Sequence, residues 1–364
     1  MKSASIVAVA ASATVAVATP WGHHYSPWGY GPASGSKAWN LKKFTSLVAF
    51  GDSYTDDSRL GYFINNGTPP VGYANPANYH SADGGRPWPQ YVAQYTGAHV
   101  YNYAVSGAVC SNNITPRYFS AIKAPFPSVE QYEVPAYIAD SKYSYPNGTK
   151  FLTVPASQTV YSIFIGTNDL GNYAFLTDSQ VAGTTIVNYT DCVFNQLQTL
   201  YSTGARYFVL QNVAPLNLVP QYADPAHGGL ASSQYWPDKA NYSTNITEIS
   251  YKMAEYVALV NDVFTYQTPY LVEVAKRFPG AHFAVMDING LLTDIYNNPS
   301  AYLNGTAPLN VTSYVNLNGK PNASPDSFIW YDELHPSEQT DRIIARTFVD
   351  VVKGSSKWAT YWSS

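Results

Sequence analysis

From about residue 44 onward, short apolar runs alternate with longer amphipathic stretches. The apolar runs contain β-branched residues and end in polar, Gly-containing motifs, which is typical of buried strands that lead into loops. They are predicted strands at 46–53, 99–108, 159–169, 206–215 and 282–290. The other stretches are predicted helices at 88–97, 128–142, 179–203, 246–277 and 336–354. This alternation predicts an α/β fold with a parallel sheet covered by helices, and functional groups are expected at the carboxyl ends of the strands.

The N-terminal pattern is different. Lys2 precedes an apolar, Ala-rich run over residues 6–18, which is too short for a membrane span of about 20 residues. A positive residue, an apolar run and small residues before a cleavage point are typical of a secretory signal. We therefore expect residues 1–18 to be removed and the protein to be secreted, with an ordinary buried helix as the alternative. Residues 19–43, rich in Gly, Pro and aromatic residues, predict an N-terminal arm, and residues 44–364 are expected to form one domain.

Composition excludes several classes of partner. Only 12% of the residues are charged, 15% are aromatic, and the formal net charge is −4. A nucleic-acid-binding protein needs a basic surface, and this chain has no excess of Lys and Arg. The apolar and aromatic content excludes intrinsic disorder as the general state. No second apolar stretch of spanning length follows, so we expect no stable membrane association, and nothing in the sequence argues for more than a monomer.

Export to an oxidising compartment would explain two further features. Cys110 and Cys192 could form one disulfide there, with two free buried thiols as the alternative. Nine Asn-x-Ser/Thr sequons are candidate glycosylation sites, and glycans would hydrate a surface that is poor in charge. These are Asn66, Asn113, Asn147, Asn188, Asn241, Asn245, Asn304, Asn310 and Asn322.

Four polar motifs lie at the ends of predicted strands or before the last predicted helix. Ser53 ends the first (FGDS), Gly107 lies in the second (NYAVSGA), Asn168 lies in the third (GTND), and Asp332 and His335 lie in the fourth (DELHP). A serine hydroxyl becomes nucleophilic when a base removes its proton, and an imidazole oriented by a carboxylate is such a base. An asparagine amide offers two N–H donors to a developing oxyanion.

Each motif alone is a weak signal, and the chain holds competing candidates. Asp224 and His227 have the same spacing as the DELHP pair, and Ser106 is a second serine beside a glycine. We favour His335 as the base because of the order of the motifs and the Pro-initiated helix that follows it. Ser106 lacks the G-x-S-x-G surroundings of a nucleophile elbow. Asp169 is expected to be a supporting hydrogen-bonding group.

Together and in this order, the motifs resemble those of the GDSL/SGNH hydrolases, and the resemblance extends over residues 44–352. It implies a three-layer α/β/α sandwich with a five-stranded parallel, flavodoxin-like sheet. It also implies that Ser53 is the nucleophile, that His335 is the general base and acid, and that Asp332 orients His335. The oxyanion hole would consist of the backbone N–H groups of Ser53 and Gly107 and the side-chain amide of Asn168. Such an esterase forms an acyl-enzyme and requires no metal or other cofactor.

For the substrate, the chain is most similar to secreted fungal acetylesterases of carbohydrate esterase family 16, through the segments FGDSYTDDSR and GRPWPQYV. This similarity implies release of acetate from acetylated plant cell-wall saccharides such as xylo-oligosaccharides. Tyr54, Trp88 and Tyr103 lie near the motifs and are candidate platforms for sugar rings, with core packing as the alternative. Two other functions stay open: a longer-chain carboxylesterase or lipase of the same superfamily, and a secreted carbohydrate-binding protein without catalysis. An ordinary histidine pKa of about 6.5 predicts that activity falls on acidification through about pH 5–7.

Overall fold

The computed structural model describes residues 38–76, 79–317 and 322–364. A six-stranded sheet lies at its centre, in the order β10-β7-β6-β5-β1-β2. Five neighbouring strands are parallel, and each lies within a predicted strand. They are β1 (Ser46–Gly51), β2 (His99–Asn102), β5 (Thr159–Phe164), β6 (Tyr207–Gln211) and β7 (His282–Met286). The predicted parallel sheet is therefore confirmed.

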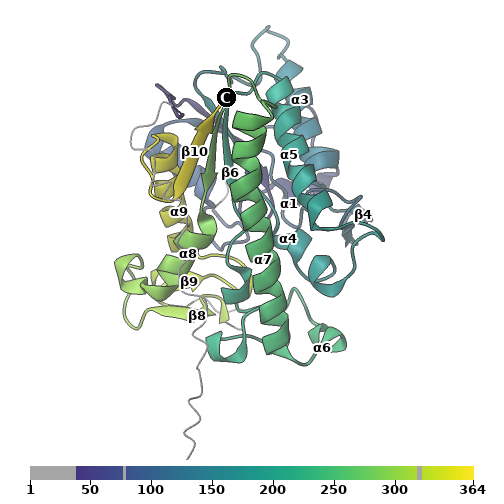
Figure 1. Cartoon of the computed structure of the whole chain (residues 1–364), viewed down its shortest axis with the longest axis vertical. Helices are drawn as coiled ribbons and strands as arrows, with labels where there is room; N and C mark the ends of the chain where they lie inside the picture. Colours follow the sequence, from purple (N-terminus) through teal and green to yellow (C-terminus); the bar gives the residue numbers. More distant parts are fainter. Residues whose placement is uncertain (1–37, 77–78, 318–321) are drawn as a thin grey trace, which may run out of the picture. The chain divides into compact units, whose positions relative to one another are not determined.

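The predicted number of five strands is wrong. β10 (Ala359–Ser363) adds a sixth strand, which pairs antiparallel with β7 at one edge of the sheet (Figure 1). An edge strand needs a partner on one side only, so a short aromatic run suffices, and here Tyr361 and Trp362 pack partly buried against the core. The sequence signal is weak because five residues after the last predicted helix look like a tail.

Burial on both faces explains why the central strands are mostly apolar instead of alternating. Every residue of β1, β5 and β6 is buried. A parallel strand that helices cover on both sides has no solvent-facing side, so the few polar side chains in it need internal partners. For example, Gln211 on β6 donates to the hydroxyl of Ser162 on β5 at 3.0 Å. The edge strand β2 has an exposed His99 and is correspondingly more polar.

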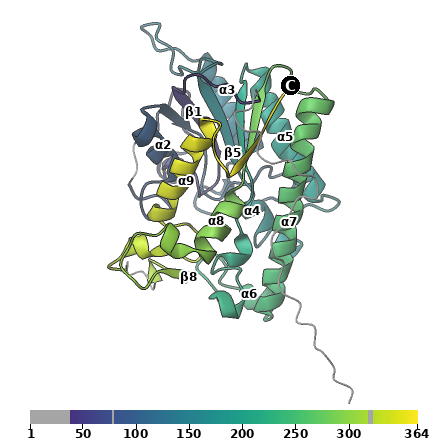
Figure 2. The ribbon, with the colours of Figure 1, turned by 60° about the vertical axis from the view of Figure 1, so that its left-hand side comes forward.

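Helices cover the sheet on both faces (Figures 1 and 2). On one face lie α2 (Trp88–Thr96) and α9 (Glu338–Val352), which pack against each other. On the other face lie α3 (Val134–Lys142), α5 (Ile186–Ser202) and α7 (Ile246–Pro269). This is the three-layer α/β/α arrangement that the family resemblance implies.

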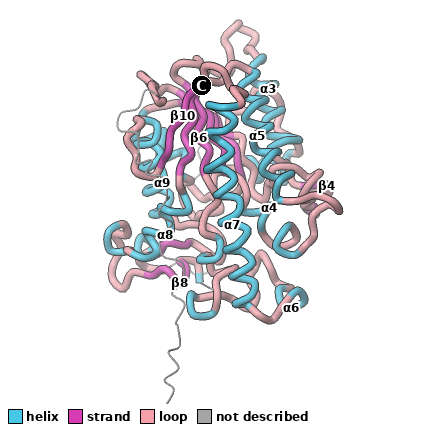
Figure 3. Tube along the Cα trace, viewed as in Figure 1, coloured by secondary structure: helices cyan, strands magenta, loops and turns pink. Residues whose placement is uncertain are grey.

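Shorter elements connect these layers, and several of them lie toward the end of the sheet where the parallel strands finish (Figure 3). Two are two-stranded sheets: an antiparallel one of β3 (Tyr118–Phe119) with β4 (Ala124–Pro125), and a parallel one of β8 (Asn310–Tyr314) with β9 (Phe328–Trp330). The short helices are α1 (Arg59–Asn66), α4 (Thr167–Leu170), α6 (Lys239–Tyr242) and α8 (Ile288–Asn297).

The predicted signal peptide, residues 1–18, and most of the predicted arm, 19–43, lie outside the described residues. The described end of the arm packs on the domain. Trp39 is buried, its indole N–H donates to the carbonyl of Val352 at 2.7 Å, and its ring meets Tyr207 at 5.4 Å between centroids. These contacts hold Trp39, near the first described residue, against α9 and β6. Among the described residues, no helix is both long enough and apolar enough to cross a membrane.

Cys110 and Cys192 are disulfide-bonded, so the alternative of two free thiols does not apply. The bond joins the loop after β2 to α5 across a sequence separation of 82. The nine sequon asparagines all reach the surface, eight of them exposed and Asn310 half-buried.

The parallel strands bring the predicted site residues to one edge of the sheet. Ser53 follows β1, Gly107 follows β2, and Asn168 lies in α4 directly after β5. Asp332 and His335 lie between β9 and α9. Residues that are up to 282 positions apart therefore meet where the strands end.

Candidate active site

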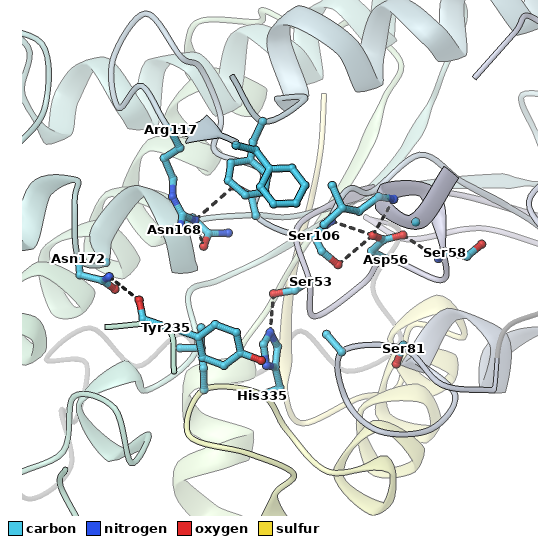
Figure 4. A pocket seen from close by; sticks show the side chains of 18 of the residues that line it. Ser53, Asp56, Ser58, Ser81, Ser106, Arg117, Asn168, Asn172, Tyr235 and His335 are labelled. Atoms are coloured by element: carbon cyan, nitrogen blue, oxygen red, sulfur yellow. Dashed lines mark hydrogen bonds between the residues drawn. The ribbon is translucent and has the colours of Figure 1, made fainter. Parts of the chain in front are cut away.

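Three side chains form a continuous hydrogen-bonded line at the end of β1. The Ser53 Oγ lies 2.8 Å from Nε2 of His335 (Figure 4). Nδ1 of His335 lies 3.0 Å from each carboxylate oxygen of Asp332. Exposed fractions are 5% for Ser53 and 3% for both His335 and Asp332, so water competes little for these contacts. An oriented imidazole in contact with a serine hydroxyl can remove its proton.

A tight turn after β1 presents Ser53 to solvent-accessible space. Gly51 has a φ of 153°, and a Cβ there would lie 2.2 Å from the carbonyl oxygen of Phe164 on β5, so only glycine fits. The Gly51 N–H donates to the buried carboxylate of Glu133 at 2.9 Å. Asp52 is buried and accepts a backbone hydrogen bond at 3.1 Å within the same turn. The chain therefore leaves the strand in a fixed direction.

The turn that carries His335 also holds Asp332. Oδ1 of Asp332 accepts from the backbone N–H groups of Leu334 and His335, both at 2.8 Å. Oδ2 accepts from the hydroxyl of Tyr235 at 2.7 Å. Directly afterwards Ser337 caps the N-terminus of α9. The carboxylate and the imidazole are thus fixed by a turn that leads into a rigid helix.

The charges of the Asp332–His335 pair support each other. Burial alone would raise the pKa of Asp332, but the neighbouring imidazole and the N–H donors outweigh it and lower the pKa. Burial alone would lower the pKa of His335, but the Asp332 carboxylate outweighs it and raises the pKa to about 9. Asp332 therefore stays ionised and stabilises an imidazolium that forms during a reaction.

The predicted oxyanion donors border the same cavity as Ser53. Gly107 has a φ of 85°, and a Cβ there would lie 2.4 Å from the Phe126 ring, so this position also requires glycine. Nδ2 of Asn168 donates to the carbonyl of Ala108 at 2.8 Å, which leaves its second hydrogen for a ligand. The residues of the three predicted donors all line one cavity, in which N–H groups can stabilise negative charge on a ligand oxygen.

The cavity has a volume of about 570 Å³, within the usual range of about 300–1,000 Å³ for ligand sites. One part of its wall is polar and another is apolar (Figure 4). The polar lining residues include Asp56, Ser58, Ser81, Asn172 and Tyr235, and the apolar ones include Leu60, Ala82, Phe119 and Phe126. Among the described residues, no group of three His, Cys, Asp or Glu side chains is arranged to hold a metal ion.

The candidate sugar platforms Tyr54, Trp88 and Tyr103 do not line this cavity, and that prediction is wrong. Their exposed fractions are 1%, 0% and 1%, so no ligand can reach their rings. The Tyr54 hydroxyl donates to a backbone carbonyl at 2.6 Å, the Trp88 indole to a threonine hydroxyl at 3.2 Å, and the Tyr103 hydroxyl to a carboxylate at 2.8 Å. Their apolar bodies fill the core while their polar atoms find internal partners.

Neither competing candidate forms a second catalytic set. Nδ1 of His227 lies 2.8 Å from Asp224, but this pair is on the surface and His227 does not line the cavity. Ser106 lines the cavity, but its Oγ donates to Asp56 at 2.8 Å and not to a histidine. Asp169 accepts from the N–H of Cys110 at 3.0 Å, which fits the supporting role expected for it.

Two residues of the site have no sequence motif. Arg117 lines the cavity and donates to the side-chain carbonyl of Asn168. Tyr235 lines it as well, donates to Asp332, and places its ring edge-on to His335 at 5.2 Å between centroids. Both lie in long connecting segments without periodicity, where no spacing rule links a side chain to a distant strand end.

Comparison with known families gives a match over nearly the whole domain. Residues 47–348 match the family described as GDSL-like Lipase/Acylhydrolase. An acetylesterase from Hypocrea jecorina is 42% identical over 328 residues, which are 88% of this chain and 92% of that protein. An acetylesterase from Thermothelomyces thermophilus is 26% identical over 317 residues, which are 85% of this chain and 88% of that protein.

Among solved structures, a catalytic mutant of an acetylxylan esterase from Geobacillus stearothermophilus aligns with 87% of this chain and 96% of its own. That alignment has 14% sequence identity and a TM-score of 0.39.

Proposed function

The chain belongs to the GDSL-like lipase/acylhydrolase family and is a carboxylic ester hydrolase, and from this premise we propose that it releases acetate from acetylated plant cell-wall oligosaccharides such as xylo-oligosaccharides. The observation that carries the proposal is the buried contact of 2.8 Å between Ser53 Oγ and His335 Nε2 at the wall of the cavity. The 42% identity to an acetylesterase supports acetate as the acyl group.

In the proposed reaction, Ser53 Oγ attacks the ester carbonyl carbon while His335 Nε2 takes the hydroxyl proton. The carbonyl electrons move to oxygen, and this oxyanion accepts hydrogen bonds from the N–H groups of Ser53 and Gly107 and from Asn168. Removing one such donor typically raises the barrier by about 2.7–4 kcal/mol. The intermediate then collapses, the C–O bond to the sugar breaks, and His335 gives its proton to the departing sugar oxygen.

The second half releases acetate. Water attacks the acetyl-Ser53 carbonyl while His335 takes a water proton, and the same three donors stabilise the second tetrahedral intermediate. Collapse breaks the bond to Ser53 Oγ, which recovers its proton from His335. Asp332 keeps the imidazole oriented and offsets its positive charge in both halves.

The cavity supports a saccharide as the part of the ester that leaves. An acetyl group fills only a small part of about 570 Å³, so the cavity also has room for the group to which the acetate is attached. Side chains of Asn172 and Tyr235 offer hydrogen-bonding atoms there. Tyr235 is 36% exposed as a residue and lines the cavity, so it can contact a ligand as the three buried aromatics cannot.

The test is acetate release from acetylated xylo-oligosaccharides by the wild type, Ser53→Ala and Ser106→Ala. We expect Ser53→Ala to abolish release, because among the described residues no other hydroxyl forms a hydrogen bond with His335. We expect Ser106→Ala to reduce it far less. Equal losses in the two variants would contradict the assignment of Ser53. Esters of long fatty acids serve as the comparison: faster hydrolysis of these would replace the saccharide by the longer-chain alternative. A folded wild type that binds the oligosaccharide but hydrolyses no ester would favour the non-catalytic alternative.

We also propose that the protein is a secreted, N-glycosylated monomer. The apolar run at residues 6–18, the disulfide and the surface positions of the sequons support secretion and glycosylation.

A further inference from the structure

Arg117 contacts one of the three proposed oxyanion donors, the Asn168 amide, and also the backbone carbonyl of Gly107. Its Nη1 donates to the carbonyl of Gly107 at 3.3 Å and also to the Oδ1 of Asn168. Figure 4 shows the guanidinium directly over the Asn168 amide, on the side of the cavity opposite His335. We propose that Arg117 is a positioning residue for ester hydrolysis, which fixes the Asn168 amide as an oxyanion donor and holds the peptide that follows Gly107. This inference rests on the proposed roles of Gly107 and Asn168.

The first argument is the orientation of the amide. A guanidinium has only donors, and a backbone carbonyl has only acceptors. Asn168 lies between one of each, since its Oδ1 accepts from Arg117 and its Nδ2 donates to the carbonyl of Ala108 at 2.8 Å. Rotating the amide by half a turn would place donor against donor and acceptor against acceptor. Arg117 and Ala108 therefore allow one orientation, in which the second Nδ2 hydrogen is free for the oxyanion.

The second argument is the charge of Arg117. None of the ion pairs in the described part of the chain includes its guanidinium. The positive charge instead acts on two carbonyl oxygens, Oδ1 of Asn168 and the backbone carbonyl of Gly107. The Asn168 amide carries one proposed donor, and the Gly107 carbonyl belongs to the peptide next to the one that carries another. A cation on a carbonyl oxygen polarises the amide and strengthens hydrogen bonds in the partly buried site. Its field also favours negative charge where the oxyanion forms.

The third argument is the rigid mounting of Arg117. Its backbone N–H donates to Asn112 at 3.1 Å, and its carbonyl accepts from the N–H of Phe126 at 2.7 Å, next to the β3–β4 pair. The guanidinium carbon lies 5.3 Å from the centroid of the Phe126 ring, which itself abuts Gly107. Phe126 stacks on Phe119 at 4.5 Å. Hydrogen bonds thus fix the backbone N–H and carbonyl of Arg117, and the Phe126 ring packs against its guanidinium.

The experiment is a double-mutant cycle with 4-nitrophenyl acetate as substrate, using the wild type, Arg117→Met, Asn168→Ala and the double variant. In the wild-type background we expect Arg117→Met to lower kcat by about 10- to 100-fold, the loss of hydrogen bonds from a charged group, with little change in KM. In the Asn168→Ala background the side-chain amide that Arg117 positions is already absent. We therefore expect Arg117→Met to lower kcat there by about threefold or less. An equal factor in both backgrounds, an effect confined to KM, or an unchanged kcat would overturn the proposal.

Arg277→Met is the matched control. Arg277 also donates to two side-chain carbonyl oxygens, Gln198 at 3.0 Å and Asn195 at 2.7 Å, and lies 5.7 Å from a Phe278 ring centroid, but it does not line the cavity. We expect its kcat to equal that of the wild type. Because Arg117→Met could reduce the folded fraction, kcat is referred to the folded protein measured by thermal unfolding. Ser53→Ala separates the two proposals. If Ser53→Ala retains hydrolysis, the proposed function fails. If Ser53→Ala abolishes hydrolysis but the double-mutant cycle gives one of the contradicting results, only the Arg117 inference fails.

Discussion

His335 is the residue whose charge state decides when the proposed enzyme works. It must be neutral to take the Ser53 proton, and burial alone would favour that form. The Asp332 carboxylate at 3.0 Å outweighs burial and raises the pKa of His335 to about 9. The competent fraction therefore grows as the pH rises toward that pKa and shrinks on acidification below it.

We predict that kcat/KM for 4-nitrophenyl acetate falls as the pH is lowered. The midpoint of this fall, the acidic limb of the profile, is expected above the ordinary histidine pKa of about 6.5. This moves the expected loss of activity upward from the interval of about pH 5–7 that an unperturbed histidine implies. The measurement is kcat/KM across neutral and alkaline pH, with stability checked at each end. A limb below the ordinary value, or a flat profile, would contradict the account of His335.

We predict that Tyr235 stabilises the Asp332–His335 pair through a hydrogen bond to Asp332. Its hydroxyl donates to Asp332 Oδ2 at 2.7 Å, and without it the carboxylate charge would act more strongly on His335. Tyr235→Phe keeps the ring, so we expect kcat to fall by about 3- to 10-fold and the pH limb to move further upward. Tyr251→Phe, on an exposed ring of α7 at 67% exposure, is the control. An unchanged kcat and an unchanged limb in Tyr235→Phe would show that the hydrogen bond has no role.

At this scale the motif residues could be predicted and the cavity wall could not. Ser53, Gly107 and His335 are identifiable because motifs at successive strand ends must converge on one edge of a parallel sheet. Being next to a motif does not say which way a side chain points, so the sequence leaves a sugar platform and core packing both open for Trp88, and the structure shows core packing. Arg117 was missed because a hairpin brings it to Asn168 across 51 positions without any pattern in the sequence.

At the scale of elements, the disulfide holds the loop that supplies Gly107. Cys110 follows Gly107 by three positions and is bonded to Cys192 on α5, 82 residues away. We predict that replacing both cysteines by alanine lowers the free energy of unfolding by about 2–4 kcal/mol, because a long closed loop regains freedom in the unfolded chain. The measurement is denaturant unfolding without reductant. A double variant as stable as the wild type would contradict it, and single variants are unsuitable because each leaves a free thiol.

The elements themselves follow from burial. Parallel strands such as β1 have nearly continuous apolar runs because helices cover both faces. β10 could not be predicted, since an edge strand of five residues buries too little to leave a distinct pattern. The long helix predicted over 246–277 instead ends as an α-helix at Pro269 and continues as a wider turn over Tyr270–Val274. Proline in its last turn accounts for this change, because its ring removes a backbone hydrogen bond.

At the scale of the whole molecule, the sequons give a prediction about the surface. None of the nine asparagines lines the cavity. With only 12% charged residues, the surface would depend on glycans for hydration. We predict that protein secreted by a eukaryotic host loses mass on treatment with an N-glycan-cleaving enzyme, becomes less soluble and keeps its kcat. An unchanged mass would show that no sequon is occupied.

The central claim, a serine esterase that passes through an acetyl-enzyme, is tested most directly by locating the acyl group. The protein is mixed with 4-nitrophenyl acetate, quenched with acid during turnover and digested for peptide mass spectrometry, with Ser53→Ala treated in parallel. Our account predicts one acetyl group on the peptide that contains Ser53, and none at any site in Ser53→Ala. Turnover by the wild type with the acetyl group on another residue, or with Ser53→Ala turning over equally well, would contradict it.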